Sequence, residues 1–200
     1  MAAAAPVTPP DPLLLQLYRY SWQPARYANP AWLAALGFRP RPTWRYGQQP
    51  QLDQGLNQAL RQWRGIPPLG HALTPRARRL ARLAPVMPQA ALGLGLLALD
   101  CSDYLLLPGY REVIGQWLSE ATLWQLFGLC SGKRGAVWAP EALVEQAMTL
   151  GTAVLTRMAV IEPVLSPLLL LLPPPARALW PTVPSTALIL LEQVLCPPTH

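Results

Sequence analysis

Two glycine-rich segments contain the residue types of nucleotide-binding loops. Gly93-Leu-Gly95-Leu-Leu-Ala98 has the letters of a dinucleotide-binding turn, in which backbone N–H groups between a strand and a helix bind pyrophosphate. Pro85 and Pro88 disfavour a strand before it, so the segment predicts a tightly packed helix. The second segment, residues 128–134, is one residue too short for a phosphate loop and has Arg134 where a Mg²⁺-binding hydroxyl is required. We therefore expect no phosphate loop.

A metal site or a reactive thiol would need side chains from distant parts of the chain. Asp100, Cys101 and Asp103 cluster at a predicted helix end, but neither histidine lies nearby in sequence and C-x-x-C pairs are absent. We interpret these residues as caps and turn formers. A thiol nucleophile would require Cys101 or Cys130 to meet His71 across the fold, whereas free cysteines are usually buried small hydrophobes. The residues predict no enzyme, no metal and no cofactor.

Arginines concentrate in the N-terminal part of the chain. Residues 1–82 contain eleven arginines against two aspartates, a balance of +9, whereas residues 83–200 carry −3. Four of the arginines surround Leu80 and Leu83 on a helix predicted over residues 74–84. We take six arginines as candidate partner-binding residues: Arg61, Arg64, Arg76, Arg78, Arg79 and Arg82. An acidic protein surface suits this charge, and a solvated helix face is the simpler alternative.

The composition points to a folded chain with a sparsely charged surface. Hydrophobic residues make up 52% of the 200 residues and charged residues 13%, which excludes an intrinsically disordered chain. The 25 prolines have no Gly-X-Y period, which excludes collagen. A folded chain of this mass exposes roughly 9,300 Å², or one charge per roughly 360 Å². We therefore expect apolar surface that is covered by a partner.

The apolar segments do not have the pattern of a signal peptide or a membrane span. Leu83–Leu99 contains two prolines and a glutamine, and Met158–Leu172 contains Glu162 and two prolines, whereas a span needs about 20 largely apolar residues. We expect a soluble, cytoplasmic protein without direct membrane insertion. Peripheral membrane binding through Leu168–Leu172 and Trp180 remains an alternative.

Prolines behind capping residues and glycines mark the predicted helix starts and ends. Together with apolar residues at helical spacing, they predict helices over, or beginning at, the following positions: 30–36, 51–64, 75–84, 88–99, 110–118, 123–130, 140–162, Ser166 and Ser185. The inward face of helix 51–64 is predicted to contain Leu52, Leu56, Ala59, Leu60 and Trp63.

The regions between these helices complete the predicted fold. Residues 39–50 are predicted as a loop and Ser131–Gly135 as a turn, and no segment has the period-two alternation of a strand. An all-α fold follows, as a single compact domain of about eight helices over residues 11–200. Residues 1–10, rich in alanine and proline, are expected to form a loose leader.

Several segments, in order along the chain, are similar to a known family. Tyr18-Arg-Tyr20, Pro24-Ala-Arg-Tyr27 and Trp32-Leu33 place an aromatic-flanked basic residue, a proline and a tyrosine before an apolar helix. The later segments are Arg79-Leu-Ala-Arg-Leu83, Leu118-Ser-Glu-Ala-Thr-Leu-Trp-Gln-Leu126, Leu150 to Pro163, and Leu188–Cys196. The pattern resembles the SctK (YscK/PscK) family of type III secretion accessory proteins over residues 17–196. The leader before Asp11 and the segment Leu165–Pro175 depart from it.

The resemblance implies a helical, non-enzymatic adaptor of the cytoplasmic sorting platform in a Gram-negative injectisome. Such a protein links the cytoplasmic domain of the inner-membrane ring protein SctD to the pod protein SctQ, at the cytoplasmic face of the inner membrane. We then expect the Arg76–Arg82 helix, together with Arg61 and Arg64, to contact one of these partners rather than nucleic acid.

The main alternative is a basic helical protein that binds nucleic acid or regulates its use. Arginines of the Arg76–Arg82 helix would then contact phosphates, and Trp44 and Tyr46 would stack on bases. Against it, the recognisable nucleic-acid-binding motifs are missing.

Overall fold

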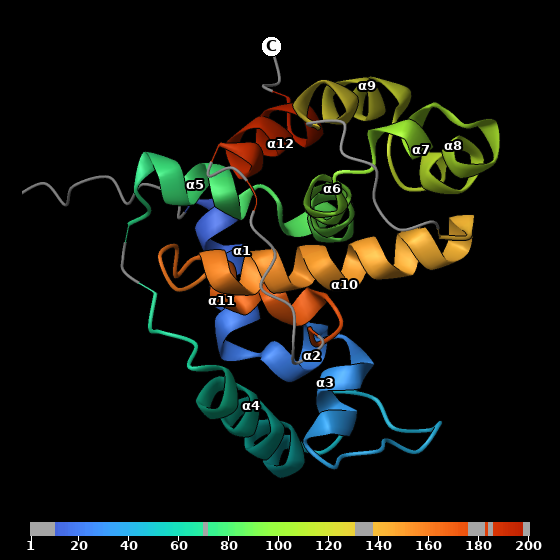
Figure 1. Ribbon diagram of the computed structural model, residues 1–200. Helices are drawn as coiled ribbons and strands as arrows, with labels where there is room; N and C mark the ends of the chain where they lie inside the picture. Colours follow the sequence, from blue (N-terminus) through green and yellow to red (C-terminus); the bar gives the residue numbers. More distant parts are fainter. Residues whose placement is uncertain (1–10, 70–71, 131–137, 176–182, 184–185, 198–200) are drawn as a thin grey trace, which may run out of the picture.

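The computed structural model describes residues 11–69, 72–130, 138–175, 183 and 186–197, and these residues form helices and no strand (Figure 1). The predicted all-α fold is confirmed. The helices are α1 Pro12–Trp22, α2 Pro24–Tyr27, α3 Pro30–Ala35, α4 Pro50–Arg64, α5 Pro75–Ala81, α6 Met87–Leu99, α7 Ser102–Leu106, α8 Pro108–Gly115, α9 Glu120–Leu129, α10 Pro140–Met158, α11 Leu165–Leu168 and α12 Ala187–Leu195, with the 3₁₀ helices η1 Ala84–Val86 and η2 Leu169–Leu171. In this described part, eight helices are seven residues or longer, in line with the predicted number.

Prolines and capping side chains begin many of these helices, as the sequence predicts. Proline occupies the first turn of α1, α3, α5 and α10, among others, where its missing N–H has no helical partner to lose. The side chains of Asp11, Asn29, Thr74 and Ser119 each accept a hydrogen bond from a backbone N–H in the first turn of the helix that follows. Asn29 and Thr74 therefore begin helices at the predicted places.

The core of the molecule is the crossing of α6 and α10. Figure 1 shows α6 end-on above the long α10, so the two helices cross at a steep angle. Every residue from Ala90 to Leu97 is buried, because α10, α12 and α9 surround α6. Gly95 lies against the backbone of Ala147, and Gly151 lies against the backbone of Ala91. The glycine pair of the Gly93–Ala98 segment thus serves helix packing, and no strand precedes it.

A second, smaller hydrophobic cluster joins α2, α3 and α4 to η2, at the bottom of Figure 1. Its centre is Trp32, which is 2% exposed and donates its indole N–H to the carbonyl of Leu172 at 2.7 Å. The backbone N–H of Asn29 also donates to the carbonyl of Leu170, at 2.7 Å. Segments about 140 residues apart in the chain are therefore held together at this cluster.

The predicted inward face of α4 needs correction. Leu56 and Leu60 are buried, but Trp63 is 49% exposed, and the polar Asp53 and Asn57 are buried instead. Asn57 accepts from the N–H of Ala25 at 3.0 Å and donates to the hydroxyl of Tyr46 at 2.8 Å. Asp53 accepts from the N–H of Gly47 at 2.7 Å. These polar contacts to α2 and the loop before α4 rotate the buried face away from the apolar stripe.

Three helix ends and one surface also differ from prediction. The helix expected to end at Ala84 ends at Ala81, the helix expected over residues 110–118 ends at Gly115, and the helix expected to reach Glu162 ends at Met158. Leu168–Leu172, considered above as a membrane-binding segment, packs inward: four of its five leucines are 1% exposed or less. These four leucines are therefore core residues, and Leu171 is partly buried against the same core.

One helical run, Pro75–Leu99, is long and apolar enough by composition to span a membrane within the described residues. It combines α5, η1 and α6, and 72% of its most apolar window is buried inside the fold. A helix that is buried to this extent by other helices of the same chain is typical of a protein core. Some predictions fall outside the described residues: the loose leader 1–10, the turn Ser131–Gly135, the helix start at Ser185, and the positions of His71 and Trp180.

Candidate functional site

Three of the four arginines on α5 and at its C-cap, Arg82, form ion pairs within the fold. Arg76 pairs with Glu162, in the turn after α10. Arg78 pairs with Asp11 at 3.0 Å, and Arg82 pairs with Glu192 on α12 at 3.6 Å. The charge of this helix is therefore largely balanced by carboxylates from distant parts of the chain.

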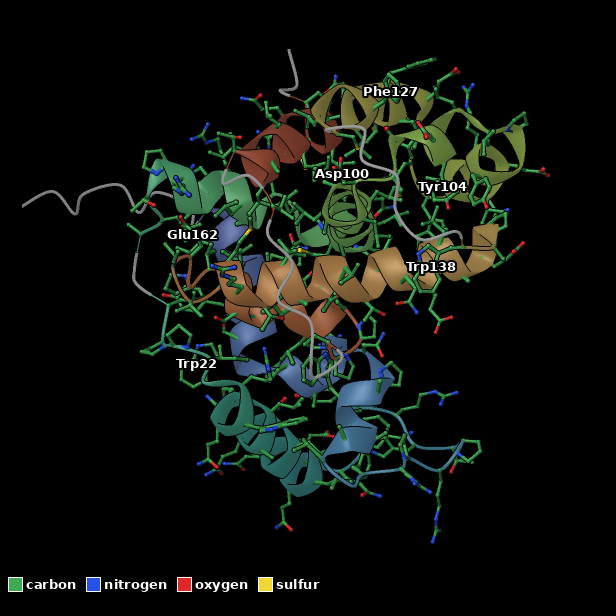
Figure 2. All side chains as sticks on the ribbon, viewed as in Figure 1. Trp22, Asp100, Tyr104, Phe127, Trp138 and Glu162 are labelled. Atoms are coloured by element: carbon green, nitrogen blue, oxygen red, sulfur yellow. The ribbon has the colours of Figure 1, made fainter. Side chains whose placement is uncertain are left out.

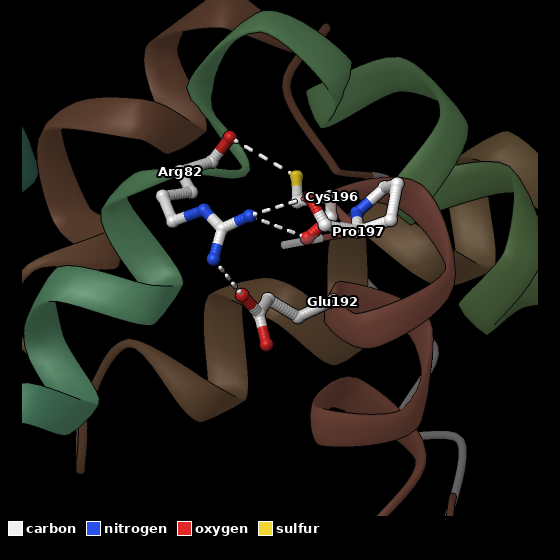
Figure 3. Close-up of polar contacts among 4 residues, drawn as sticks. All are labelled: Arg82, Glu192, Cys196 and Pro197. Carbon is white, nitrogen blue, oxygen red and sulfur yellow. Dashed lines mark hydrogen bonds and ion pairs between the residues drawn. The ribbon is translucent and has the colours of Figure 1, made fainter. Parts of the chain in front are cut away.

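Arg82 also binds the end of α12 (Figure 3). Its guanidinium donates to the backbone carbonyls of Cys196 at 2.5 Å and Pro197 at 3.1 Å, and the Cys196 thiol donates to the carbonyl of Arg82 at 3.3 Å. Glu192 is only 3% exposed, so this arginine neutralises a buried carboxylate. Arg82 holds α12 against α5.

Arg79 differs from its neighbours, because its guanidinium makes no ion pair with any described residue. It lies at the edge of a pocket of about 100 Å³ between α5, α12 and the turn after α10. The apolar lining includes Leu80, Leu188 and Met158. Beside the pocket, Ile161 is 79% exposed.

Arg61 and Arg64 lie on α4 and stack on tryptophans. The Arg61 guanidinium is 5.1 Å from the ring of Trp22, which is 62% exposed, and that of Arg64 is 4.7 Å from the ring of Trp32. Burial lowers the pKa of the Arg64 guanidinium. Arg61 lines an open hollow of about 500 Å³, and Arg64 lines a neighbouring one of about 370 Å³.

The three hollows follow one another along one side of the molecule. The hollows at Arg61 and Arg64 share Gly65 and Pro67, and the second also contains Val160, which is next in sequence to Ile161 of the α5–α12 pocket. Figure 2 shows Trp22 and Glu162 on this same side. We name this surface the basic face and define it by these residues: Trp22, Arg61, Arg64, Arg76, Arg79, Val160 and Ile161. Arg78 and Arg82 line none of these three hollows, and their guanidinium groups pair with Asp11 and Glu192.

A second group of exposed apolar side chains lies on α7 to α9, at the upper right of Figure 1. Leu106 is 45% exposed, Leu107 46% and Trp124 52%. Arg111 is 5.7 Å from the Trp124 ring and pairs with Glu120 at 2.6 Å. We name this group, Leu106, Leu107 and Trp124, the apolar corner. The α6–α10 crossing separates it from the basic face.

Asp100, Cys101 and Cys130, considered above for metal binding or catalysis, lie at helix ends. Asp100 ends α6 in the left-handed conformation, with φ 50°. Burial raises the pKa of the Cys101 and Cys130 thiols to about 11. The neighbouring Cys130 raises the pKa of Cys101 further, and the charge of Asp100 raises the pKa of both thiols. Within the described residues, no three histidine, cysteine or acidic side chains form a group suited to a metal ion. The geometry brings together arginines and apolar side chains.

Comparison with protein families identifies the chain. The model of a family described as "Type III secretion system subunit" matches residues 15–174. The chain belongs to this family. The matched residues run from α1 past η2, so they include the contact between α3 and η2, whereas α12 lies beyond them. No curated protein matches the chain, and no solved structure does.

In this type III secretion system subunit, the sequence predicted the arginines of the basic face but not its exposed apolar side chains. The helix predicted over residues 140–162 contains Val160 and Ile161 in its last turn. They lie instead in the turn after α10 and are 83% and 79% exposed. Glu162 and Pro163, directly after two β-branched residues, were the available signal for a helix end.

Proposed function

We propose that this type III secretion system subunit is a non-enzymatic adaptor of the cytoplasmic sorting platform. In this role it links the cytoplasmic domain of the inner-membrane ring protein SctD to the pod protein SctQ, at the cytoplasmic face of the inner membrane. Membership of the family supports a function in the type III secretion system. The similarity of residues 17–196 to the SctK pattern supports the adaptor role within that system.

The separation of two exposed surfaces supports an adaptor in particular. An adaptor needs one surface for each neighbour, and exposed large apolar side chains usually mark such surfaces. The basic face includes Trp22 and Ile161, and the apolar corner includes Trp124. Because α6 and α10 lie between them, the two surfaces are far enough apart in the fold to serve two different proteins in an adaptor.

The ion pairs of α5 disfavour the nucleic-acid alternative. Phosphate binding needs several cationic side chains free to replace counterions. Arg76, Arg78 and Arg82 already pair with carboxylates of this chain. Trp44, proposed above to stack on bases, packs its ring edge-on against Phe38, with ring centres 5.3 Å apart.

The proposal is tested by binding the purified chain separately to the SctD cytoplasmic domain and to SctQ, and then to both together. We expect two binary complexes and one ternary complex of defined mass. Replacing Trp124 by serine on the apolar corner should weaken one binary complex and leave the other intact. Absence of binding to either protein would contradict the adaptor role, and competition between the two proteins would contradict the two-surface arrangement.

A further inference from the structure

The pocket between α5 and α12 has the size and lining of a site for one aliphatic side chain. Its volume is about 100 Å³, and an apolar cavity of about 150 Å³ is enough to bind benzene. Leu80 and Leu188, which line the pocket, are 4% and 5% exposed and belong to the close-packed hydrophobic core. A rigid apolar hollow binds a side chain with little cost in ordering the protein.

The charges around this pocket leave one positive group unbalanced. Glu162 and Glu192 line the pocket, and each is paired with an arginine, Arg76 and Arg82 respectively. Arg79 also lines it and has no such partner among the described residues. A ligand that carries a single carboxylate therefore complements the charge of the pocket. A polyphosphate chain does not, because it would meet the two glutamates.

The rim of the pocket adds exposed apolar surface. Ile161, which lines the pocket, is 79% exposed, and Val160, its neighbour in sequence, lines the next hollow and is 83% exposed, although both are β-branched residues that bury readily. A partner that covers them would bury apolar area around the central insertion and exclude water from the ion pair at Arg79. This arrangement, an apolar anchor with a surrounding seal, is typical of the centre of a protein interface.

We propose that the α5–α12 pocket binds a segment of a partner protein that inserts an aliphatic side chain and places a neighbouring carboxylate against Arg79. This inference rests on the proposed function, because it assumes that the chain's partners are proteins. The inserted side chain supplies apolar burial, and the Arg79–carboxylate pair fixes the orientation of the segment. Arg76 stays paired with Glu162 and keeps the α5 side of the pocket in place.

The first test uses the small molecule 4-methylpentanoate, which combines an isobutyl group with a carboxylate. Titrated into the full chain, it should shift the methyl NMR signals of Leu188, Ile189 and Ile161 in a saturable way. Its uncharged amide, and the variant Arg79→Gln, should each weaken binding at least about fivefold, because each removes the charge pairing. Equal binding of acid and amide, or shifts spread over the whole chain, would overturn the inference.

The second test measures binding of the full chain to the SctD domain and to SctQ. Arg79→Glu and Ile161→Ser should each weaken binding to the same one of these proteins at least about tenfold. Arg39→Glu, an exposed charge reversal on the loop before α4, is the matched control and should change neither affinity. Thermal unfolding should show that all three variants keep the stability of the unmodified chain.

The outcomes separate this inference from the proposed function. If both proteins bind and the two pocket variants behave like Arg39→Glu, the pocket assignment is wrong and the adaptor role stands. If neither protein binds, the adaptor role is wrong, and the 4-methylpentanoate titration still decides the pocket. A wild-type dimer abolished by Arg79→Glu, or oligonucleotide binding lost in that variant, would assign the pocket to another occupant and overturn the inference.

Discussion

The close crossing of α6 and α10 predicts that a side chain at Gly95 or Gly151 destabilises the fold. A Cβ added at Gly95 would lie 1.7 Å from the carbonyl oxygen of Ala147, and one added at Gly151 would lie 1.6 Å from that of Ala91. Contacts of real Cβ atoms are essentially never under 3.0 Å, so the helices would have to separate by more than 1 Å. Because the obstacles are backbone atoms, no side-chain movement can relieve the overlap.

The cost follows from the packing that such a separation would loosen. A gap of about 0.5–1 Å forfeits a quarter to a half of each dispersion contact across an interface, and overpacking of a core typically costs about 1–3 kcal/mol. Alanine gains about 1 kcal/mol over glycine inside a helix, which offsets only part of this. The net effect expected of Gly95→Ala and of Gly151→Ala is a free energy of unfolding lower by about 1–2 kcal/mol, or a melting temperature lower by about 2–8 °C.

Two other glycines provide graded controls. Gly55 is exposed in the middle of α4 with nothing within 4 Å, so Gly55→Ala should raise the free energy of unfolding by about 0.5–1 kcal/mol. At Gly93 an added Cβ meets the end of the Leu191 side chain at 2.9 Å, and this side chain can move. The free energy of unfolding of Gly93→Ala should therefore lie between that of Gly55→Ala and those of Gly95→Ala and Gly151→Ala.

The measurement is urea and thermal unfolding of each variant, followed by circular dichroism. The expected order of stability is Gly55→Ala, then Gly93→Ala, then Gly95→Ala and Gly151→Ala. If the last two variants were as stable as the unmodified chain, the close approach of α6 and α10 would be wrong, and with it the placement of both surfaces that the crossing separates.

Three further predictions concern the polar contacts and the thiols. Arg82→Ala leaves the buried carboxylate of Glu192 unpaired and should lower the free energy of unfolding by about 2–3 kcal/mol in urea titrations, with partial recovery on adding Glu192→Gln. Asn57→Ala removes the acceptor for a buried N–H of α2 and should cost about 1–3 kcal/mol, with faster amide exchange in α2 as the local readout. The raised pKa values of Cys101 and Cys130 mean that the folded state holds these protons more tightly than the unfolded chain, whose thiols have an ordinary value of 9.0. Their stabilising contribution is complete below pH 9 and is lost as the pH rises towards 11, so melting temperatures should fall over this window, less so in a variant with both cysteines replaced by alanine.

Local features of the fold were predictable from the sequence because their causes are local. The Asn29-Pro30 and Thr74-Pro75 pairs begin α3 and α5, since a capping oxygen and a proline ring act within one helical turn. Gly37 ends the α3 region with φ 81°, as its position after the apolar residues predicts. The Gly93–Ala98 segment was correctly interpreted as a packed helix, although its partner Ala147 could not be named from spacing.

The features that the sequence did not predict depend on contacts between distant segments. The periodicity of α4 favours an apolar face with Trp63, but hydrogen bonds from α2 and the preceding loop to Asn57 and Asp53 decide which face is buried. Contacts between distant segments also decide which charges are balanced within the fold. Four arginines in seven residues of sequence look like one basic patch, yet the partner of Arg82 lies on α12, about 110 residues away.

This use of charge bears on how the molecule would bind its partners. The chain has only ten acidic residues, and Asp11, Glu162 and Glu192 are engaged with the arginines of α5. Internal pairing thus neutralises most of that helix and leaves Arg79 beside an apolar pocket and the exposed Ile161. A surface built this way should bind chiefly by apolar burial, with one charge contact selecting the orientation. Its affinity for a protein partner should therefore depend only weakly on salt, in contrast to the steep dependence that several free arginines would give with nucleic acid.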